Sequence, residues 1–166
     1  MQVMPENLTA RGLAQRAWAV ISAGDMAYDR GPRDRAMAVM EHAWAGGVRY
    51  FDTSISYSYS ESQEIIGKAL KEVRDQVFVT TKVDFWDVSK PDGRFTEVPK
   101  GEATRQVELN LKELGSDYID AILIHGTPGV EQMTVEQCME VHEELVKARD
   151  KGLIRFVGFS AHHYFD

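Results

Sequence analysis

Four polar residues follow apolar runs of the sequence: Asp52, Lys82, His125 and Ser160. In parallel α/β folds the carboxyl ends of the strands meet at one rim, and the reactive groups lie there. We therefore expect an acid, a cation and an imidazole to converge, with Tyr57 in the loop behind Asp52. Each residue alone is as often structural as functional, but their coincidence at one rim favours a site.

This set of side chains suits proton transfer by a tyrosine. A free phenol has a pKa of about 10, so it needs a nearby cation to act as an acid or base at neutral pH. Lys82 would supply that cation, and Asp52 would hold Lys82 in place. His125 would donate a hydrogen bond to a carbonyl oxygen of the substrate and orient it towards Tyr57.

Strands and helices must alternate to bring these residues together. Apolar and β-branched runs predict strands at residues 18–22, 48–51, 77–83, 118–124 and 154–159. Helices are predicted between them: after Pro32, after capping-box patterns at 60–63 and 134–137, and around 107–114. This spacing predicts parallel strands joined by right-handed crossovers.

The fold class is therefore α/β, with two architectures open. One is a doubly wound open sheet, and the other is part of a parallel (β/α) barrel of the TIM type. The first strand-to-helix turn, residues 22–26, lacks the G-x-G-x-x-G spacing. Dinucleotide binding of the Rossmann kind is unsupported for that reason.

Composition narrows the classes of protein further. The 166 residues suit one domain, and 19 basic against 26 acidic residues give a net charge of -7. This charge argues against a nucleic-acid partner or an anionic membrane surface. Cys138 is the only cysteine, which excludes an internal disulfide or a cysteine-rich metal site. With no membrane span and no secretory segment in the sequence, we expect a cytoplasmic protein.

Residues 84–101 interrupt the alternation with a polar stretch that contains three large aromatic side chains. We expect a long functional loop here, in which Phe85 and Trp86 line a substrate pocket. The alternative is a loop whose aromatic side chains only cap the barrel.

Several motifs together resemble the aldo-keto reductase superfamily, from its first barrel strand through its fifth. They are Phe51-Asp-Thr-Ser54, Tyr57-Ser-Tyr-Ser-Glu61, Ile66-Gly-Lys-Ala-Leu70, Thr81-Lys82, Asp117-Tyr-Ile-Asp120, Leu123-Ile-His-Gly126 and Gly152-Leu-Ile-Arg-Phe-Val-Gly-Phe-Ser160. The resemblance covers roughly residues 17 to 164. It predicts an N-terminal extension at 1–16 and, at 17–166, a partial (β/α) barrel of about five βα units.

The resemblance implies an NADPH-dependent oxidoreductase that reduces aldehyde or ketone groups. The residues that match the family's catalytic tetrad are Asp52, Tyr57, Lys82 and His125. Tyr59 stands where the family varies freely, which makes it the weaker candidate for the acid. Cofactor-binding positions implied by the resemblance are Gly24 and Ser160, and no metal is implied.

We expect the chain to be the N-terminal portion of a longer enzyme acting on a small carbonyl substrate. The alternative is a catalytically incompetent half-barrel that serves as an assembly or regulatory module, with self-association through open sheet edges. A third hypothesis, a metal-dependent barrel hydrolase, would use Asp52, His125 and either His162 or His163 as ligands. It is the weakest, because neighbouring strand residues such as His162 and His163 point to opposite sides.

Overall fold

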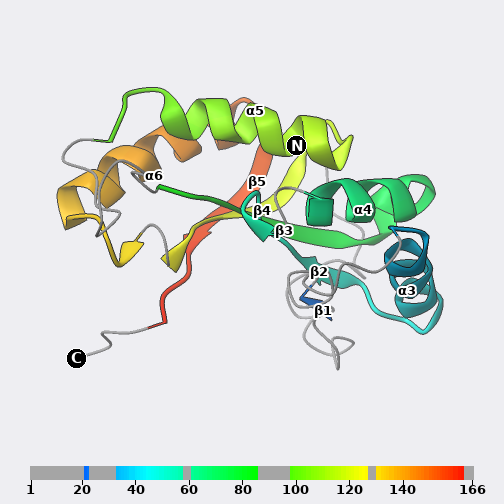
Figure 1. Cartoon of the computed structure of the whole chain (residues 1–166). Coiled ribbons are helices and arrows are strands. Elements are labelled where there is room, and N and C mark those ends of the chain that lie inside the picture. The colour runs from blue at the N-terminus through cyan, green and yellow to red at the C-terminus, as the bar shows by residue number, and fades with distance from the viewer. Residues whose placement is uncertain (1–20, 23–32, 58–60, 86–97, 127–129, 163–166) are drawn as a thin grey trace. The chain divides into compact units, whose positions relative to one another are not determined.

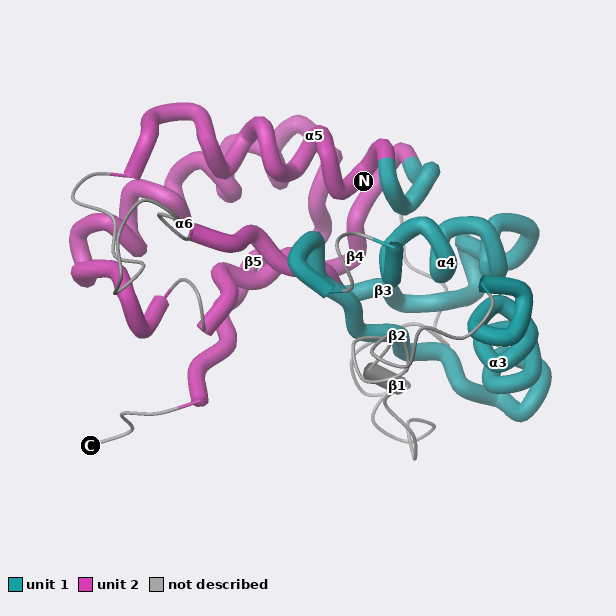
Figure 2. Tube along the Cα trace, viewed as in Figure 1, with its two compact units in different colours: residues 1–80, 113–116 teal, residues 81–112, 117–166 magenta. Residues whose placement is uncertain are grey.

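The computed structural model describes residues 21–22, 33–57, 61–85, 98–126 and 130–162 (Figure 1). The chain divides into two compact units (Figure 2). Unit 1 comprises residues 1–80 and 113–116, and unit 2 comprises residues 81–112 and 117–166.

The described strands form one sheet, in which neighbouring strands follow the order of the sequence, β1-β2-β3-β4-β5. Pairing is parallel between β1 and β2, between β2 and β3, and between β4 and β5. The strands are β1 (Ile21–Ser22), β2 (Tyr50–Asp52), β3 (Phe78–Val83), β4 (Ile119–Ile124) and β5 (Ile154–Phe159). The predicted α/β class with parallel strands is confirmed.

The described part of unit 1 contains two α-helices and a short 3-10 helix beside its strands. They are α3 (Arg33–Ala45), α4 (Glu61–Ala69) and η3 (Lys71–Gln76), and α3 packs against α4 (Figure 1). The core includes Met40, Phe51 and Ile66, each at most 1% exposed. Gly67 lets α4 approach the chain at Leu114, because a Cβ at Gly67 would lie 2.3 Å from the Leu114 carbonyl oxygen.

Unit 2 contains the helices α5 (Glu102–Leu114, its last two residues in unit 1) and α6 (Val135–Asp150). Strand β4 is buried along nearly its whole length, as its mainly apolar sequence predicts, and Asp120 is its one charged residue. Helix α6 packs on β4 and β5. The predicted capping box is confirmed at the start of α6: Thr134 accepts from the Gln137 amide, and the Gln137 side chain accepts from the Thr134 amide.

Among the described residues, the predicted bounds of β3, β4 and β5 lie within one residue of those observed, and residues 18–20 of the first predicted strand lie outside the described part of the chain. Strand β2 begins at Tyr50, two residues later than predicted, and the 3-10 helix η3 was not foreseen. Its sequence is charged and has no fully buried residue, so it lacks the apolar periodicity that reveals a packed helix. Gly115 and Gly152 follow α5 and α6 with positive φ angles of 58° and 81°, which glycine adopts without steric cost.

Candidate functional site

In unit 1, Asp52 is the last residue of β2 and pairs in register with Thr80 of β3. The pairing continues one residue further, since the Thr53 amide donates to the Thr80 carbonyl at 2.9 Å. Asp52 is half-buried and lies at the carboxyl end of its strand, as the sequence predicts.

Tyr57 lies in the turn that follows β2 and is also half-buried. Its amide donates to the Ser54 carbonyl at 3.1 Å, which closes the turn. The hydroxyls of Ser54 and Ser56 are 3.0 Å apart, and that of Thr53 lies 2.8 Å from the Ser62 hydroxyl on α4. The turn that carries Tyr57 is therefore hydrogen-bonded within itself and to α4.

In unit 2, Lys82 and His125 are both buried, each 4% exposed. Lys82 lies in β3, and His125 follows β4 directly. The His125 amide donates to the Val83 carbonyl at 3.0 Å, so the backbone registers the two strand ends against each other. Lysine and histidine side chains are seldom this buried in proteins, so both residues are candidates for a catalytic role.

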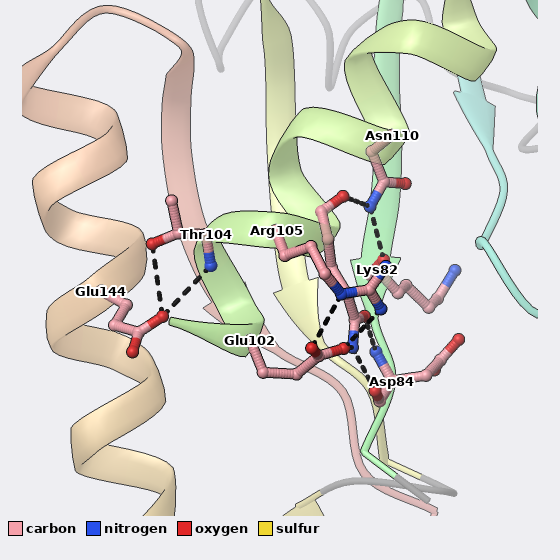
Figure 3. Close-up of polar contacts among 8 residues, drawn as sticks. Lys82, Asp84, Glu102, Thr104, Arg105, Asn110 and Glu144 are labelled. Atoms are coloured by element: carbon pink, nitrogen blue, oxygen red, sulfur yellow. Dashed lines mark hydrogen bonds and ion pairs between the residues drawn. The ribbon is translucent and has the colours of Figure 1, made fainter. Parts of the chain in front are cut away.

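His125 has a carboxylate partner that the sequence analysis missed. Its Nδ1 atom is hydrogen-bonded to the Asp84 carboxylate. Figure 3 shows the side chains of Lys82 and Asp84 leaving the chain on the same side, away from α5. The signal was present in the sequence, because residues two apart on an extended chain point to the same side. Asp84 had instead been assigned to the polar loop.

Helix α5 holds the end of β3 through its polar side (Figure 3). Asn110 accepts a hydrogen bond from the Thr81 hydroxyl at 2.7 Å and donates to the Lys82 carbonyl at 3.2 Å. Gln106 accepts from the Asp84 amide at 2.8 Å and donates to the Asp84 carbonyl at 2.7 Å. Residues four apart share one helix face, so Gln106 and Asn110 fix the backbone at Lys82 and Asp84 together.

Glu102 extends this row by one turn. Its carboxylate accepts from Gln106 at 2.9 Å and from two nitrogens of Arg105 at 2.6 and 2.8 Å (Figure 3). The hydrogen bond from Arg105, aided by that from Gln106, lowers the pKa of Glu102 below its usual value. Hydrophobic periodicity in the sequence does not reveal this row, because its residues are polar.

Ser160 lies at the end of β5 and contacts the residue that follows His125. Its hydroxyl accepts from the Gly126 amide at 2.9 Å, and its own amide donates to the Ile124 carbonyl at 3.0 Å. A serine hydroxyl that accepts one hydrogen bond still has a proton to donate. Gly126 has no room for a side chain, since a Cβ there would lie 2.9 Å from the Ser160 carbonyl oxygen.

Of the other predicted cofactor- and substrate-binding residues, only Phe85 lies within the described residues. Phe85 is 0% exposed and belongs to the core of unit 2. Its contact with a substrate stays a prediction. Gly24 and Trp86 lie outside the described residues, as do Tyr59 and His163.

Within the described ranges, no three His, Cys, Asp or Glu side chains gather closely enough to hold a metal ion. Among the helices that the structure describes, none has the length and apolar character to cross a membrane.

Chemically, unit 2 offers an ammonium, an imidazole with a carboxylate partner, and a hydroxyl near the strand ends. These groups can donate hydrogen bonds to an oxygen that gains negative charge during a reaction. Unit 1 offers a carboxylate and a phenol at the end of β2.

Comparison with known proteins finds similar oxidoreductases, several of which are named aldo-keto reductases. The chain is 36% identical to the aldo-keto reductase YhdN of Bacillus subtilis, over 69% of this chain and 33% of that protein. It is 28% identical to the uncharacterized oxidoreductase YqkF of the same organism, over 78% of this chain and 40% of that protein. An aldo-keto reductase from Bacillus halodurans in its holo form superposes with a TM-score of 0.70 at 25% identity, covering 85% of this chain and 45% of that structure.

The chain thus spans less than half the length of each of these relatives. Its parallel strands and helices form a partial barrel, as the resemblance implies. The model of the aldo/keto reductase family matches residues 20–165, which is nearly the whole chain. With sequence motifs, fold and family model in agreement, the protein belongs to the aldo/keto reductase family.

Proposed function

We propose that this chain is the tetrad-bearing portion of an NADPH-dependent reductase of aldehyde and ketone groups. The observation that carries the proposal is the placement of polar groups at the strand ends of this family member. Lys82 and His125 are buried in unit 2, and Asp52 and Tyr57 lie at and after the end of β2 in unit 1. Parallel barrels carry their catalytic groups at these strand ends.

In this proposal each tetrad residue has one task. Tyr57 gives a proton to the carbonyl oxygen, and the ammonium of Lys82 stabilises the phenolate that is left. Asp52 holds Lys82, and His125 donates a hydrogen bond that orients the substrate oxygen. Burial of Lys82 and His125 supports these roles, because hydrogen bonds to charged groups are stronger where water is excluded.

The residues present suit a nicotinamide cofactor at its reactive end. Ser160 accepts from the Gly126 amide and retains a hydroxyl proton, which can bond to the carboxamide oxygen of a nicotinamide. When bound, NADPH would supply the hydride. Among relatives, the aldo-keto reductase yakc of Schizosaccharomyces pombe, 27% identical over 80% of this chain, has NADP(+) in its name.

The substrate class is proposed on similar grounds. The methylglyoxal reductase DkgA of Yersinia pestis is 32% identical over 70% of this chain, and its name states reduction of a small carbonyl compound. We propose small aldehydes and ketones as substrates. We also propose that Phe85 and Trp86 line the substrate pocket.

The test is NADPH consumption with a panel of aldehydes and ketones. The longest natural form of the protein should show turnover, and Tyr57→Phe should abolish it, because phenylalanine has no proton to give. Tyr59→Phe is the matched control and should retain turnover. Activity unchanged in Tyr57→Phe would refute the tetrad.

The 166-residue chain alone should reduce the same panel at least about 100-fold more slowly. Positioning of the hydride donor contributes much of the rate, and the chain spans only 33% to 45% of the relatives that supply the comparison. Turnover by this chain at the rate of the longer form would contradict that expectation.

The alternative function is an assembly or regulatory module without catalysis. One relative favours it, a putative voltage-gated potassium channel subunit beta from Schizosaccharomyces pombe, 34% identical over 52% of this chain. The two functions are separated by adding NADPH and measuring the quenching of tryptophan fluorescence. A module without catalysis should show no saturable quenching, either in the 166-residue chain or in the longest natural form.

A further inference from the structure

The contact between Asp84 and His125 determines which nitrogen of the imidazole carries a proton. Both side chains are well buried, 11% exposed for Asp84 and 6% for His125. An ionised carboxylate has only acceptor sites, so the ring nitrogen that it contacts must be a donor. The atom in contact is Nδ1. A proton therefore stays on Nδ1 for as long as the pair is intact.

We propose that Asp84 is a positioning residue, which holds the Nδ1 proton of His125 and leaves Nε2 to serve the reacting oxygen. The inference rests on the proposed function, in which His125 donates a hydrogen bond to the substrate carbonyl. Because Nδ1–H is committed to Asp84, Nε2 can donate only when the ring is an imidazolium. His125 then acts as a cationic donor, with Asp84 as its counter-ion.

The surroundings of Asp84 suit this task. Gln106 hydrogen-bonds both the amide and the carbonyl of Asp84, so the backbone that carries the carboxylate is fixed on α5. The His125 amide is fixed in turn on the Val83 carbonyl, one residue before Asp84. The two side chains thus start from backbone positions that are held within one unit.

Such a pair would contribute to catalysis through charge. Hydride addition turns a carbonyl oxygen into an alkoxide-like oxygen, and a charged donor stabilises that oxygen more than a neutral donor does. Lys82 leaves β3 on the same side as Asp84, so the Asp84 carboxylate also offsets positive charge on that side of the strand (Figure 3).

The test is the protonation pattern of the His125 ring, read by long-range nitrogen-proton NMR on the 166-residue chain. His125→Gln assigns the signals. At about pH 8, where an ordinary imidazole is neutral, Nδ1 should still carry a proton. A spectrum in which Nδ1 is unprotonated and Nε2 is protonated would overturn the inference, whether or not the protein is a reductase.

Asp84→Leu supplies the second arm. Leucine offers Nδ1 no acceptor, so the proton should shift towards Nε2 in this variant, whereas the side-chain oxygen of an asparagine could still accept from Nδ1. Asp150→Leu is the matched control, since Asp150 is exposed, contacts only Arg149 among the ion pairs described, and carries the same charge. The control should keep the wild-type pattern. An Asp84→Leu spectrum identical to wild type would exclude Asp84 as the positioning group.

A kinetic arm on the longest natural form separates this inference from the proposed function. Asp84→Asn should lower kcat on the order of 100-fold with a small change in KM. If turnover depends on Tyr57 but is unaffected by Asp84→Asn, the positioning role of Asp84 is wrong and the proposed reductase function stands. If Nδ1 of His125 carries a proton but no NADPH-dependent turnover is found, the role of the Asp84–His125 pair stands and the proposed reductase function is wrong.

Discussion

Asn110 is the residue on which the geometry around Lys82 depends most directly. It is fully buried, and its amide bonds the Thr81 hydroxyl and the Lys82 carbonyl. Asn110→Leu would leave both groups without this partner, and we expect the free energy of unfolding to fall by about 2 kcal/mol or more. Urea denaturation followed by circular dichroism measures the change. Glu108→Leu, on the exposed side of α5, is the control and should have a small effect.

The double variant with Thr81→Val tests the physical reason. Valine removes the hydroxyl that loses its Asn110 partner in Asn110→Leu, so the combined loss should be smaller than the sum of the two single losses. Strictly additive losses would mean that the Thr81–Asn110 bond contributes little.

Glu102 gives a pH-dependent prediction. Its pKa is lowered in the folded chain, chiefly by the hydrogen bond from Arg105. A lowered folded pKa contributes stability that is present above the unfolded value, about 4.3, and is lost as the pH falls through the folded value. Wild type should therefore be more stable than Glu102→Gln near neutral pH, by at most about 1 kcal/mol because the pair is exposed.

The measurement is urea denaturation of both proteins across acid pH. The stability difference should vanish as the pH falls below the folded pKa of Glu102. Glu108→Gln makes the same charge change on the exposed side of the helix. A difference that is constant over the whole acid range would show that the Glu102 carboxylate is not the source.

At the scale of elements, the N-terminus of α5 is capped by a side chain from another helix. Glu144 of α6 accepts from the amides of Gly101 and Thr104, at 2.6 and 3.1 Å, and from the Thr104 hydroxyl at 3.3 Å. Figure 3 shows the Glu144 carboxylate directed at Thr104. The first amides of a helix have no partner within it, and an acceptor there also meets the positive end of the helix dipole.

Glu144→Ala should therefore loosen the first turn of α5. We expect the unfolding free energy to fall by about 1 kcal/mol, and hydrogen exchange at the Thr104 amide to accelerate. Glu143→Ala, its exposed neighbour on α6, should change neither quantity. Equal exchange rates in both variants would contradict the capping role.

The elements themselves were largely predictable, for a physical reason. Strands such as β3 and β5 are recognised by β-branched or apolar residues, and α6 begins at a capping box that the sequence spells out. The polar side of α5 could not be found in this way. Gln106 and Asn110 are buried, yet their role depends on which backbone groups lie opposite, and periodicity does not report that.

The candidate site was predictable in part. Strand ends located Lys82 and His125, and both are buried in unit 2. Asp84 was missed because its type is common in loops, and its contact with His125 is made between residues 41 positions apart. The full set of tetrad roles stays a prediction.

At the scale of the whole molecule, β5 stands at one end of the strand order and presents apolar surface. Phe156 and Phe159 on this strand are 50% and 66% exposed. Edge strands with exposed apolar side chains favour pairing with another chain. We therefore expect the 166-residue chain to self-associate through β5 as its concentration rises.

Replacing both residues, Phe156→Ser with Phe159→Ser, should weaken self-association at least about 10-fold, or roughly 1.4 kcal/mol. Sedimentation velocity over a range of concentrations measures it. The matched control is Val135→Ser with Met139→Ser, because these apolar side chains are also at least half exposed but lie on helix α6 and not on an edge strand. If the α6 pair weakened association as much as the β5 pair, general apolar stickiness would be the cause. An effect confined to the β5 pair would identify the strand as the surface of contact.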